Sequence, residues 1–344
     1  MDRKKSHLDL AQQQQVHNSD FDQVRLHHCA LPNFNFSEID ISTQFLNFQL
    51  QAPIMISSMT GGTSEAEFIN QHLAEAASEC GIAMCVGSQR ISYESSSTDG
   101  LHKKVRKWAG AAPLFGNVGL ANLIQWNDAQ ALNRMAEQIE ADAMIIHLNP
   151  MQEVFQDSGD IDWHGSRECL VQSIDNCKVP VVVKEVGMGI SPEVAHICVA
   201  AGAAAIDVAG SGGTSFIDIE GAMSKQNQRI QAAKTFRNWG ESTVSLLQQL
   251  QMNRLPVPII ASGGIRNGLD IAKCIALGAS VTAIAGIILG AGRDSTNACV
   301  TLIEQLKYEL AIACWGTGCK NVHSIAQVRR SYLNHYEPVK NNSN

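Results

Sequence analysis

The feature that most constrains the fold of this chain is a series of eight short apolar runs, each ending in small or polar residues. Segments with apolar residues at three- and four-residue spacing, such as Glu65–Cys80 and Asp270–Leu277, lie between the runs and predict helices. Eight alternating units of similar length favour a (β/α)8 TIM barrel of the α/β class over a doubly wound open sheet. The predicted strands are Pro53–Ser58, Ile82–Gly87, Pro113–Asn117, Ala143–His147, Pro180–Lys184, Ala204–Val208, Val257–Ala261 and Ser280–Ala285.

The other segments divide the chain into an N-terminal extension at residues 1–50, the barrel with a C-terminal helical segment at 51–335, and a disordered tail at 336–344. The Gln12–Gln15 tract predicts a loop or a frayed segment. Asn127–Ala141 is rich in helix formers. We predict that Phe216–Gly240, rich in Gln, Lys and Arg, is a long polar loop, and such loops at this face of a barrel are often lids.

The composition excludes several functional classes. Of 344 residues, 45% are hydrophobic and 17% charged, which allows a sizeable core, and the formal net charge of -7 argues against general nucleic-acid binding. The ten cysteines are scattered without a histidine pair that completes a zinc pattern, which predicts reduced thiols in a cytoplasmic protein. The basic N-terminus lacks the apolar core of a signal peptide. Ala276–Gly292 is predicted to be a strand plus a glycine loop and not a membrane span, so we expect a soluble protein.

Three glycine-rich turns follow predicted strands and predict a phosphate site. Glycine lets backbone amides approach an anion closely, and the dipole of a following helix adds attraction. In barrels of this type the loops after the seventh and eighth strands often bind phosphate, and here they contain Ser262–Arg266 and Ala285-Gly286. Because one of these loops carries an arginine, we expect a bound phosphate such as that of FMN. The three turns are Met59–Thr63, Gly210–Thr214 and Ser262–Arg266.

Polar side chains also follow the fourth and fifth predicted strands. His147–Glu153 contains four polar residues directly after an apolar run; one such loop alone could merely cap the strand, but several other runs end in the same way. Lys184 is expected at the mouth of the barrel, where it would hold a cofactor carbonyl, form a Schiff base or pair with a carboxylate. A snorkelling or ion-paired lysine is the alternative. Glu185 points the other way along the pleat, and we interpret it as structural.

Two sets of basic residues offer positive charge to an anionic ligand. Arg3 and Lys4 with His7, taken alone, have the pattern of a solvated tail. Arg90, after the second predicted strand, is better placed to reach the mouth of the barrel. Together these cations could clamp a diphosphate, for which bidentate arginine contacts are well suited.

Taken together, these segments resemble the type 2 isopentenyl-diphosphate isomerases, FMN-dependent enzymes of the TIM-barrel class. The resemblance extends from Arg3 to the region near Asn321, and the order and spacing of its motifs are highly specific. The chain departs from the family pattern between Asp160 and Asp162, where a basic residue is usual, and at Phe216, where a tryptophan is common. The motifs that carry the resemblance are Arg3-Lys4-x-x-His7, Met59–Thr63, Gly87–Arg90, Asn117-x-Gly119, His147-x-Asn149-Pro150-x-Gln152-Glu153, Val183–Glu185, Gly210–Thr214 and Ala261–Arg266.

The resemblance implies a role for each of these positions. Contacts to the flavin ring and ribityl chain are implied for Met59, Thr60, Ser88, Asn117 and Lys184, and contacts to its phosphate for Thr214, Gly264, Arg266, Ala285 and Gly286. Contacts to the substrate are implied for Arg3, Lys4, His7, Arg90, Asn149 and Gln152. Glu153 is implied as the ligand of a Mg²⁺ ion that bridges the diphosphate, since carboxylate and phosphate oxygens suit this hard cation. Gln152 and His147 are the catalytic candidates, with a structural role for His147 as the alternative.

The implied reaction interconverts isopentenyl and dimethylallyl diphosphate, in isoprenoid biosynthesis, by adding a proton at one carbon and removing one from another. Our hypothesis is that reduced FMN performs the acid–base step, while the protein supplies orientation and electrostatics. Because the reaction is redox-neutral, NADPH is expected only to reduce the flavin. The resemblance also suggests a homo-oligomer, either a tetramer or an octamer.

Other functions remain open at this point. The nearest alternative is an FMN-dependent TIM-barrel oxidoreductase acting on a hydroxy acid or a phosphorylated substrate, which would consume its substrate by net oxidation. The non-enzymatic alternative is a barrel that binds phosphate ligands as a sensor. A nucleotide dehydrogenase of the IMP type fits less well, because Thr214 and Ser215 follow Gly213 and no cysteine nucleophile does.

Overall fold

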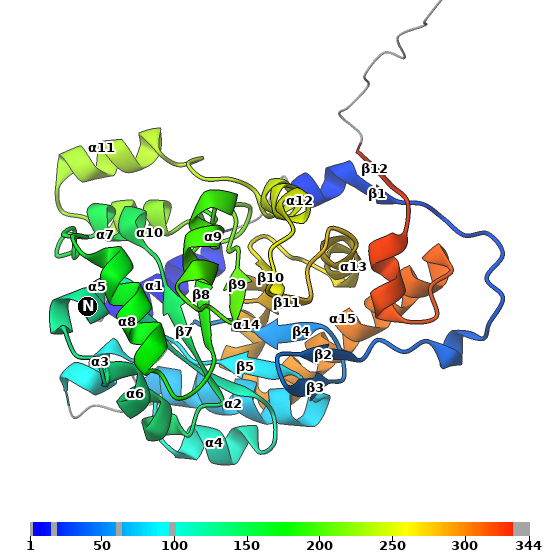
Figure 1. The fold of residues 1–344 in the computed structure, drawn as a ribbon, viewed down its shortest axis with the longest axis horizontal. Helices are drawn as coiled ribbons and strands as arrows, with labels where there is room; N and C mark the ends of the chain where they lie inside the picture. The colour runs from blue at the N-terminus through cyan, green and yellow to red at the C-terminus, as the bar shows by residue number, and fades with distance from the viewer. Residues whose placement is uncertain (1–2, 15–18, 60–63, 96–100, 333–344) are drawn as a thin grey trace, which may run out of the picture.

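The computed structural model describes residues 3–14, 19–59, 64–95 and 101–332, and within these ranges the eight predicted strands form one closed barrel (Figure 1). In spatial order the strands are β4 (Ile54–Ile56), β5 (Ala83–Cys85), β6 (Leu114–Gly119), β7 (Ala143–His147), β8 (Val181–Lys184), β9 (Ala205–Asp207), β10 (Ile259–Ser262) and β11 (Val281–Ile284). β11 pairs in parallel with β4, with Ala283 opposite Met55, so the sheet has no open edge. The predicted TIM-barrel class is therefore confirmed, and the doubly wound alternative is excluded.

Helices surround the barrel (Figure 1), and their buried apolar side chains form one core with those of the strands. They are α2 (Ser64–Cys80), α3 (Arg90–Glu94), α4 (Lys104–Ala109), α5 (Leu120–Trp126), α6 (Ala131–Ile139), α7 (Pro150–Phe155), α8 (Ser166–Asn176), α9 (Pro192–Ala200), α10 (Phe216–Met223), α11 (Asn227–Thr235), α12 (Thr243–Asn253), α13 (Gly268–Ala276), α14 (Gly286–Asp294) and α15 (Thr296–Thr317). The predicted helices at residues 65–80 and 270–277 are confirmed by α2 and α13, and the helix formers of residues 127–141 build α6.

A short hairpin closes the end of the barrel where the strands begin. It consists of β2 (Thr43–Phe45) and β3 (Phe48–Leu50), which pair antiparallel. The Phe45 ring stacks on Phe115 of β6 with centroids 6.4 Å apart, and both side chains are buried among the first residues of the strands. Because this end is plugged by apolar side chains, ligand access is left to the opposite end, where the strands terminate.

The segments before and after the barrel meet each other. The N-terminal segment contains α1 (Arg3–Gln13), the 3-10 helix η1 (Asp20–Gln23), β1 (Val24–Leu26) and η2 (Phe36–Glu38), and the C-terminal segment contains η3 (Val322–Gln327) and β12 (Arg330–Tyr332). β1 pairs antiparallel with β12. α1 packs against α10 and α14, which places the start of the chain beside the carboxyl ends of the strands. The C-terminal helical segment is α15, which packs on α2, α13 and α14.

The prediction of a long polar loop at Phe216–Gly240 is wrong, because this segment forms α10 and α11. The Ser215 side chain caps the start of α10 by accepting a hydrogen bond from the Asp218 backbone. Ile217 and Ile219 are each 1% exposed, so the apolar residues of this polar segment are buried by tertiary contacts. The segment is polar on average, so its composition did not predict that these two isoleucines are buried.

Two further local predictions need correction. The Gln12–Gln15 tract is not wholly a loop, because Gln12 and Gln13 lie within α1, and the side chain of Gln12 accepts a hydrogen bond from Arg293. The stretch Ala276–Gly292 contains the predicted strand, but a helix, α14, replaces the predicted glycine loop from Gly286 onward. The predicted tail at 336–344 lies outside the described residues.

The cysteines form no disulfide bonds with one another. All ten are free, and burial raises the pKa of the Cys85 thiol to about 12 and of Cys198 to about 11. Thiols with such pKa values are poor nucleophiles at neutral pH. In the part of the chain that the structure describes, none of the helices combines the length and the apolar character needed to cross a bilayer.

Candidate active site

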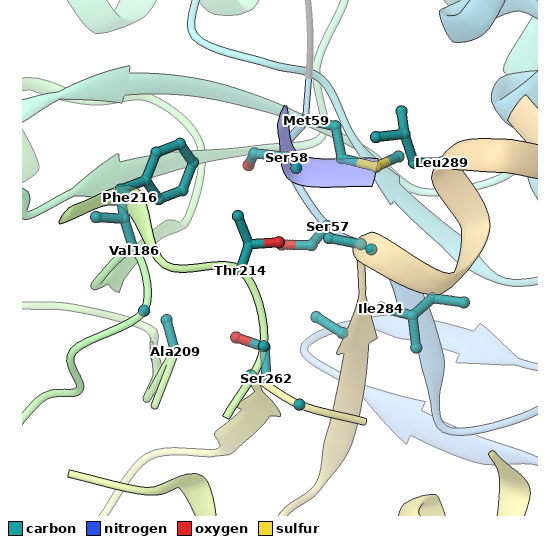
Figure 2. Close-up of a pocket in the computed structure, with 18 of the residues that line it drawn as sticks. Ser57, Ser58, Met59, Val186, Ala209, Thr214, Phe216, Ser262, Ile284 and Leu289 are labelled. Carbon is teal, nitrogen blue, oxygen red and sulfur yellow. The ribbon is translucent and has the colours of Figure 1, made fainter. Parts of the chain in front are cut away.

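A cavity of about 690 Å³ opens at the carboxyl ends of the barrel strands. Figure 2 shows Phe216 and Val186 on one side of it and Met59 and Leu289 on the other, with Thr214 between them. Residues of α1 also line it, among them two apolar ones, Leu8 and Ala11. The cavity therefore combines apolar walls with polar groups contributed by the strand ends.

The cavity brings together most of the residues for which the sequence predicted a role. Thr60 and the side chains of Arg3 and Lys4 lie outside the described part of the structure. The predicted residues that line the cavity are His7, Met59, Ser88, Asn117, His147, Gln152, Lys184, Thr214, Gly264, Arg266, Ala285 and Gly286. The other predicted residues, Arg90, Asn149 and Glu153, are described but do not line the cavity.

One end of the cavity has the backbone of an anion site. Gly264 adopts φ +74°, and a Cβ at this position would stand 2.7 Å from the Gly212 carbonyl oxygen, so only glycine fits where the two loops touch. Gly286 begins α14 and faces the same space, and the first N–H groups of a helix have no partner within it. A Cβ on Gly286 would come no nearer than 3.8 Å to Thr214 Oγ1, so room remains beside these amides. This end therefore fits a phosphate group.

The guanidinium of Arg266 is held by two carboxylates. Its Nη2 donates to Asp22 at 2.7 Å, and its Nε donates to Asp270 at 2.8 Å. Hydrogen bonds to these acids raise the pKa of Arg266 further, so it stays charged. In this arrangement Arg266 fixes the glycine loop to η1 and α13, and a contact from its side chain to a phosphate stays a prediction.

His147 and Asn117 form a pair on the neighbouring strands β7 and β6. His147 Nδ1 lies 3.0 Å from Asn117 Oδ1, within hydrogen-bond distance. Burial first, and then the charge of Lys184, lowers the pKa of His147 to about 3. The imidazole is therefore neutral at physiological pH, which favours a role in orienting Asn117 over that of a cationic acid.

Lys184 and Glu185 face different surroundings, as the pleat predicts. Lys184 lines the cavity, and its Nζ donates to the Glu185 carbonyl oxygen at 2.7 Å. Glu185 Oε2 accepts hydrogen bonds from the backbone N–H groups of Val186, Gly187, Met188 and Gly189. Burial raises the pKa of Glu185 and these four donors oppose the rise. The structural interpretation of Glu185 is thus confirmed, because its carboxylate holds the turn after β8 through these hydrogen bonds.

Gln152 reaches the cavity from α7 as part of a chain of polar side chains. Its amide Nε2 donates to Glu220 Oε1 at 3.0 Å, and its Oε1 accepts from Asn149 Nδ2 at 3.3 Å. His7 Nε2 lies 3.2 Å from the same Glu220 oxygen. His7 also packs edge to face on Phe216, with ring centroids 6.3 Å apart. The extension, α7 and α10 therefore meet around one buried carboxylate.

Glu220 is the functional candidate that sequence reasoning missed. It is 3% exposed and lies within the segment that was predicted to be a loop. Its signal was present in the sequence, since Phe216 and Glu220 are four residues apart and share a face of any helix formed there. The lining residues Leu8 and Ala11 were also missed, because the start of the chain was interpreted as a solvated tail when taken alone.

Glu153 lies behind Gln152 in a setting that fits a divalent cation. Its carboxylate is 6% exposed and accepts hydrogen bonds from Asn149 Nδ2 at 2.7 Å and from the Asp160 backbone at 2.8 Å. Burial raises its pKa. The buried oxygens Asn149 Oδ1 and Asp160 Oδ2 accept no hydrogen bond from the described part of the chain. Side-chain oxygens such as these, together with a carboxylate, are the kind of ligand that Mg²⁺ prefers.

The protein alone does not complete a metal site there. Within the described residues, no group of three or more His, Cys, Asp or Glu side chains could hold an ion. A cation near Glu153 would therefore take further oxygens from a bound ligand, which is the arrangement expected for a metal that bridges a phosphate group.

Arg90 points to acids outside the cavity. Its Nε donates to Glu94 Oε2 at 3.0 Å, one turn further along α3, and its Nη1 lies 3.8 Å from Asp160 Oδ2. The side chain is 40% exposed, so it is free to change rotamer at modest cost. Its contact with a substrate stays a prediction.

The barrel and the anion site define a class of flavoprotein. A sequence model of the FMN-dependent dehydrogenase family matches residues 117–334, which is more than half of the chain. That range contains most of the cavity-lining positions, from Asn117 to Leu289.

Similarity to named proteins narrows the class. The chain is 45% identical over 332 residues to isopentenyl-diphosphate delta-isomerase of Vibrio campbellii, covering 95% of this chain and 98% of that protein. It is 47% identical over 310 residues to the enzyme of the same name in Vibrio parahaemolyticus, covering 90% and 91%. The chain belongs to the isopentenyl-diphosphate delta-isomerase family, as the resemblance of its motifs indicated.

Solved structures share the fold at lower identity. A putative lactate oxidase of Pediococcus acidilactici superposes with a TM-score of 0.67 at 18% identity, covering 96% of this chain and 87% of that one. A mandelate oxidase superposes with a TM-score of 0.65 at 16% identity, covering 96% and 94%. At such identities the similarity supports the barrel fold alone.

Proposed function

We propose that this protein interconverts isopentenyl and dimethylallyl diphosphate with the help of reduced FMN. The observation that carries the proposal is one cavity that combines a glycine-lined anion site with Gln152 and His7, both of which contact the buried carboxylate of Glu220. The close relatives carry the name of this isomerase over nearly their whole length. The alternative is an oxidoreductase that acts on a hydroxy acid, and the experiment below distinguishes it from the isomerase.

The cavity residues support FMN as the resident cofactor. The turn at Gly263-Gly264 and the start of α14 would bind its phosphate, while Lys184, Asn117 and Ser88 line the space available to the ring and ribityl chain. When bound, reduced FMN supplies an electron-rich aromatic face next to which positive charge is stabilised, and groups that exchange protons.

The protein residues bind and orient the substrate and exclude water from it. Leu8, Ala11 and Phe216 provide apolar surface for a short hydrocarbon chain, and exclusion of water strengthens every electrostatic interaction inside. Gln152 orients the substrate through an amide that Glu220 holds in one rotamer. His147 stays neutral and fixes the orientation of Asn117.

A metal ion and basic side chains would bind the diphosphate of the substrate. Glu153 would hold Mg²⁺ through its carboxylate, Arg90, Arg3 and Lys4 would supply positive charge to the diphosphate, and His7 would contact the substrate beside them. NADPH serves only to reduce the flavin, because isomerisation leaves the oxidation state of the substrate unchanged. We further propose a homo-oligomer, a tetramer or octamer, located in the cytoplasm.

The test is an anaerobic incubation of the full-length protein with FMN, Mg²⁺, NADPH and isopentenyl diphosphate, followed by proton NMR. We expect dimethylallyl diphosphate to form while NADPH is consumed only in proportion to the flavin. Stoichiometric loss of NADPH without this product would instead show a reductase. A protein that binds no flavin and turns nothing over would show a phosphate-binding protein.

A further inference from the structure

A buried acid at the mouth of the barrel has no part in the mechanism above. Asp207 ends β9 and is 1% exposed. Its Oδ1 accepts a hydrogen bond from Ser262 Oγ at 2.6 Å and from the Ala209 backbone N–H at 3.2 Å. Ser262 and Ala209 both line the cavity, and Figure 2 shows them on its lower side, so the carboxylate lies directly behind the lining.

Asp207 and Lys184 are neighbours across two parallel strands. Lys184 of β8 is the register partner of Asp207 of β9, and side chains at paired positions point to the same face of a sheet. Burial is the largest influence on the pKa of Asp207 and raises it, and the charge of Lys184 is the largest influence that opposes the rise. The two side chains therefore share one level of the barrel interior, where the charge of Lys184 acts on Asp207.

The backbone is strained at Ala209, which donates a hydrogen bond to Asp207. Ala209 has φ +38°, a left-handed conformation that non-glycine residues rarely adopt. In this conformation its N–H donates to Asp207. A buried carboxylate and a strained donor are both costly, and such costs cluster at functional sites.

Lys184 dominates the positive charge that a flavin ring would meet. Among the described residues, Lys184 and Arg266 are the lysine and arginine side chains that line the cavity. Arg266 is already paired with two acids at the phosphate end. His147 is neutral, and the Glu185 carboxylate is saturated by four backbone donors. Asp207, at the register position of Lys184 on the neighbouring strand, is the buried acid on which the charge of Lys184 acts.

We propose that Asp207 is a positioning residue of the flavin site, which offsets the charge of Lys184 and thereby sets how strongly the site prefers reduced over oxidised FMN. It acts through Lys184 and Ser262 and does not touch the ligand itself. The inference rests on FMN binding in this cavity, and it adds to the proposed function a determinant of the redox preference of the bound flavin.

The test measures the dissociation constants of oxidised and of anionic reduced FMN for the full-length protein and its variants. In Asp207→Asn the lysine charge is no longer offset, so the preference for the anionic reduced form should rise at least about tenfold. This corresponds to a midpoint potential about 30 mV more positive for a two-electron couple. Equal changes in both dissociation constants would show a merely structural acid and overturn the proposal.

A second pair of variants keeps the test decisive if Asp207→Asn fails to fold. Lys184→Met leaves an unpaired acid, and the preference for reduced FMN should fall at least about tenfold. In the double variant Lys184→Met/Asp207→Asn both charges are gone, so the preference should return to within about threefold of the wild type. A double variant that, like Lys184→Met, prefers reduced FMN at least about tenfold less than the wild type would overturn the proposal, because Asp207 would then not offset Lys184 in the wild type.

Asp142→Asn is the matched control. It makes the same chemical change just before β7, at the opposite end of the barrel, where the carboxylate pairs with Arg106. Its preference for reduced FMN should stay at the wild-type value. Failure of the wild-type protein to bind FMN would reject the flavin site as a whole, whereas FMN binding with an unchanged preference in Asp207→Asn would reject only the role of Asp207.

Discussion

The side-chain amide of Gln152 on α7 donates a hydrogen bond to the carboxylate of Glu220 on α10, over a distance of 3.0 Å. The two residues are 68 positions apart in the chain, and His7 of the extension lies 3.2 Å from the same carboxylate oxygen. A buried carboxylate can therefore fix the orientation of an amide that faces the cavity and draw α1 toward it.

We expect Glu220→Gln to lower kcat/KM of the isomerisation by about 100-fold, because small displacements of an orienting group have effects of this size. Affinity for FMN should be unchanged, since Glu220 does not line the phosphate end of the cavity. Steady-state kinetics and a flavin titration check both points. Asp218→Asn, which changes an acid of the same helix that pairs with Arg237, is the control and should retain full activity. An unaltered kcat/KM in Glu220→Gln would show that the carboxylate of Glu220 is dispensable.

Glu153→Gln should raise the Mg²⁺ concentration needed for half-maximal activity about tenfold or more. Activity measured at varied Mg²⁺ concentration checks this effect. Asp162→Asn, at an 81% exposed side chain, is the control; an unchanged metal dependence in Glu153→Gln would remove Glu153 as a ligand.

Gly264→Ala should weaken FMN binding severely. The added Cβ meets the Gly212 carbonyl oxygen at 2.7 Å, and φ +74° is unfavourable for alanine. Gly316→Ala is a matched control on α15, where a Cβ meets nothing within 4 Å, and it should stabilise the protein by up to about 1 kcal/mol. Flavin fluorescence titration and urea unfolding give the two results. Wild-type FMN affinity in Gly264→Ala would place the phosphate elsewhere.

His147 should make the folded state sensitive to acid. Its folded-state pKa is lowered to about 3, so below the unfolded value of about 6.5 only the unfolded chain takes up this proton, and stability is lost as pH falls. Replacing His147 by Gln should reduce the slope of unfolding free energy against pH by up to about 1.4 kcal/mol per pH unit within this window. Urea unfolding across the window measures the slope. His164→Gln, at a fully exposed histidine, should give a smaller change, and equal slopes for wild type and His147→Gln would contradict the lowered pKa.

The two acids that hold Arg266 should differ in importance. Asp270 is 1% exposed, and Asp270→Asn should lower the free energy of unfolding by about 3 kcal/mol, because it breaks a buried pair. Asp22 is 59% exposed, and Asp22→Asn should have little effect on stability. Chemical denaturation of both variants tests the contrast. Equal losses of unfolding free energy in the two variants would show that the exposed pair of Asp22 and Arg266 contributes as much stability as the buried pair of Asp270 and Arg266.

Local sequence signals were sufficient to predict the barrel and most of the functional candidates at the carboxyl ends of its strands. The eight apolar runs and the glycine turns encode strand ends and anion-binding backbone within a few residues, so Lys184 and Gly264 could be placed at the cavity from the sequence. The lid-like loop at Phe216–Gly240 was the main error. Its helices depend on burial of Ile217 and Ile219 by distant segments, which composition does not report.

The sequence by itself thus determined the fold class, the family and the set of polar residues at the carboxyl ends of the strands. Only the tertiary structure decided which partner each of them takes: Gln152 with Glu220, and Arg266 with Asp22 from 244 residues away. It also places Asp207 beside Lys184 on the neighbouring strand. The physical reason is that strand and turn propensities act over a few residues. A hydrogen bond or a buried charge pair, in contrast, depends on which side chains the closed barrel brings within a few ångströms.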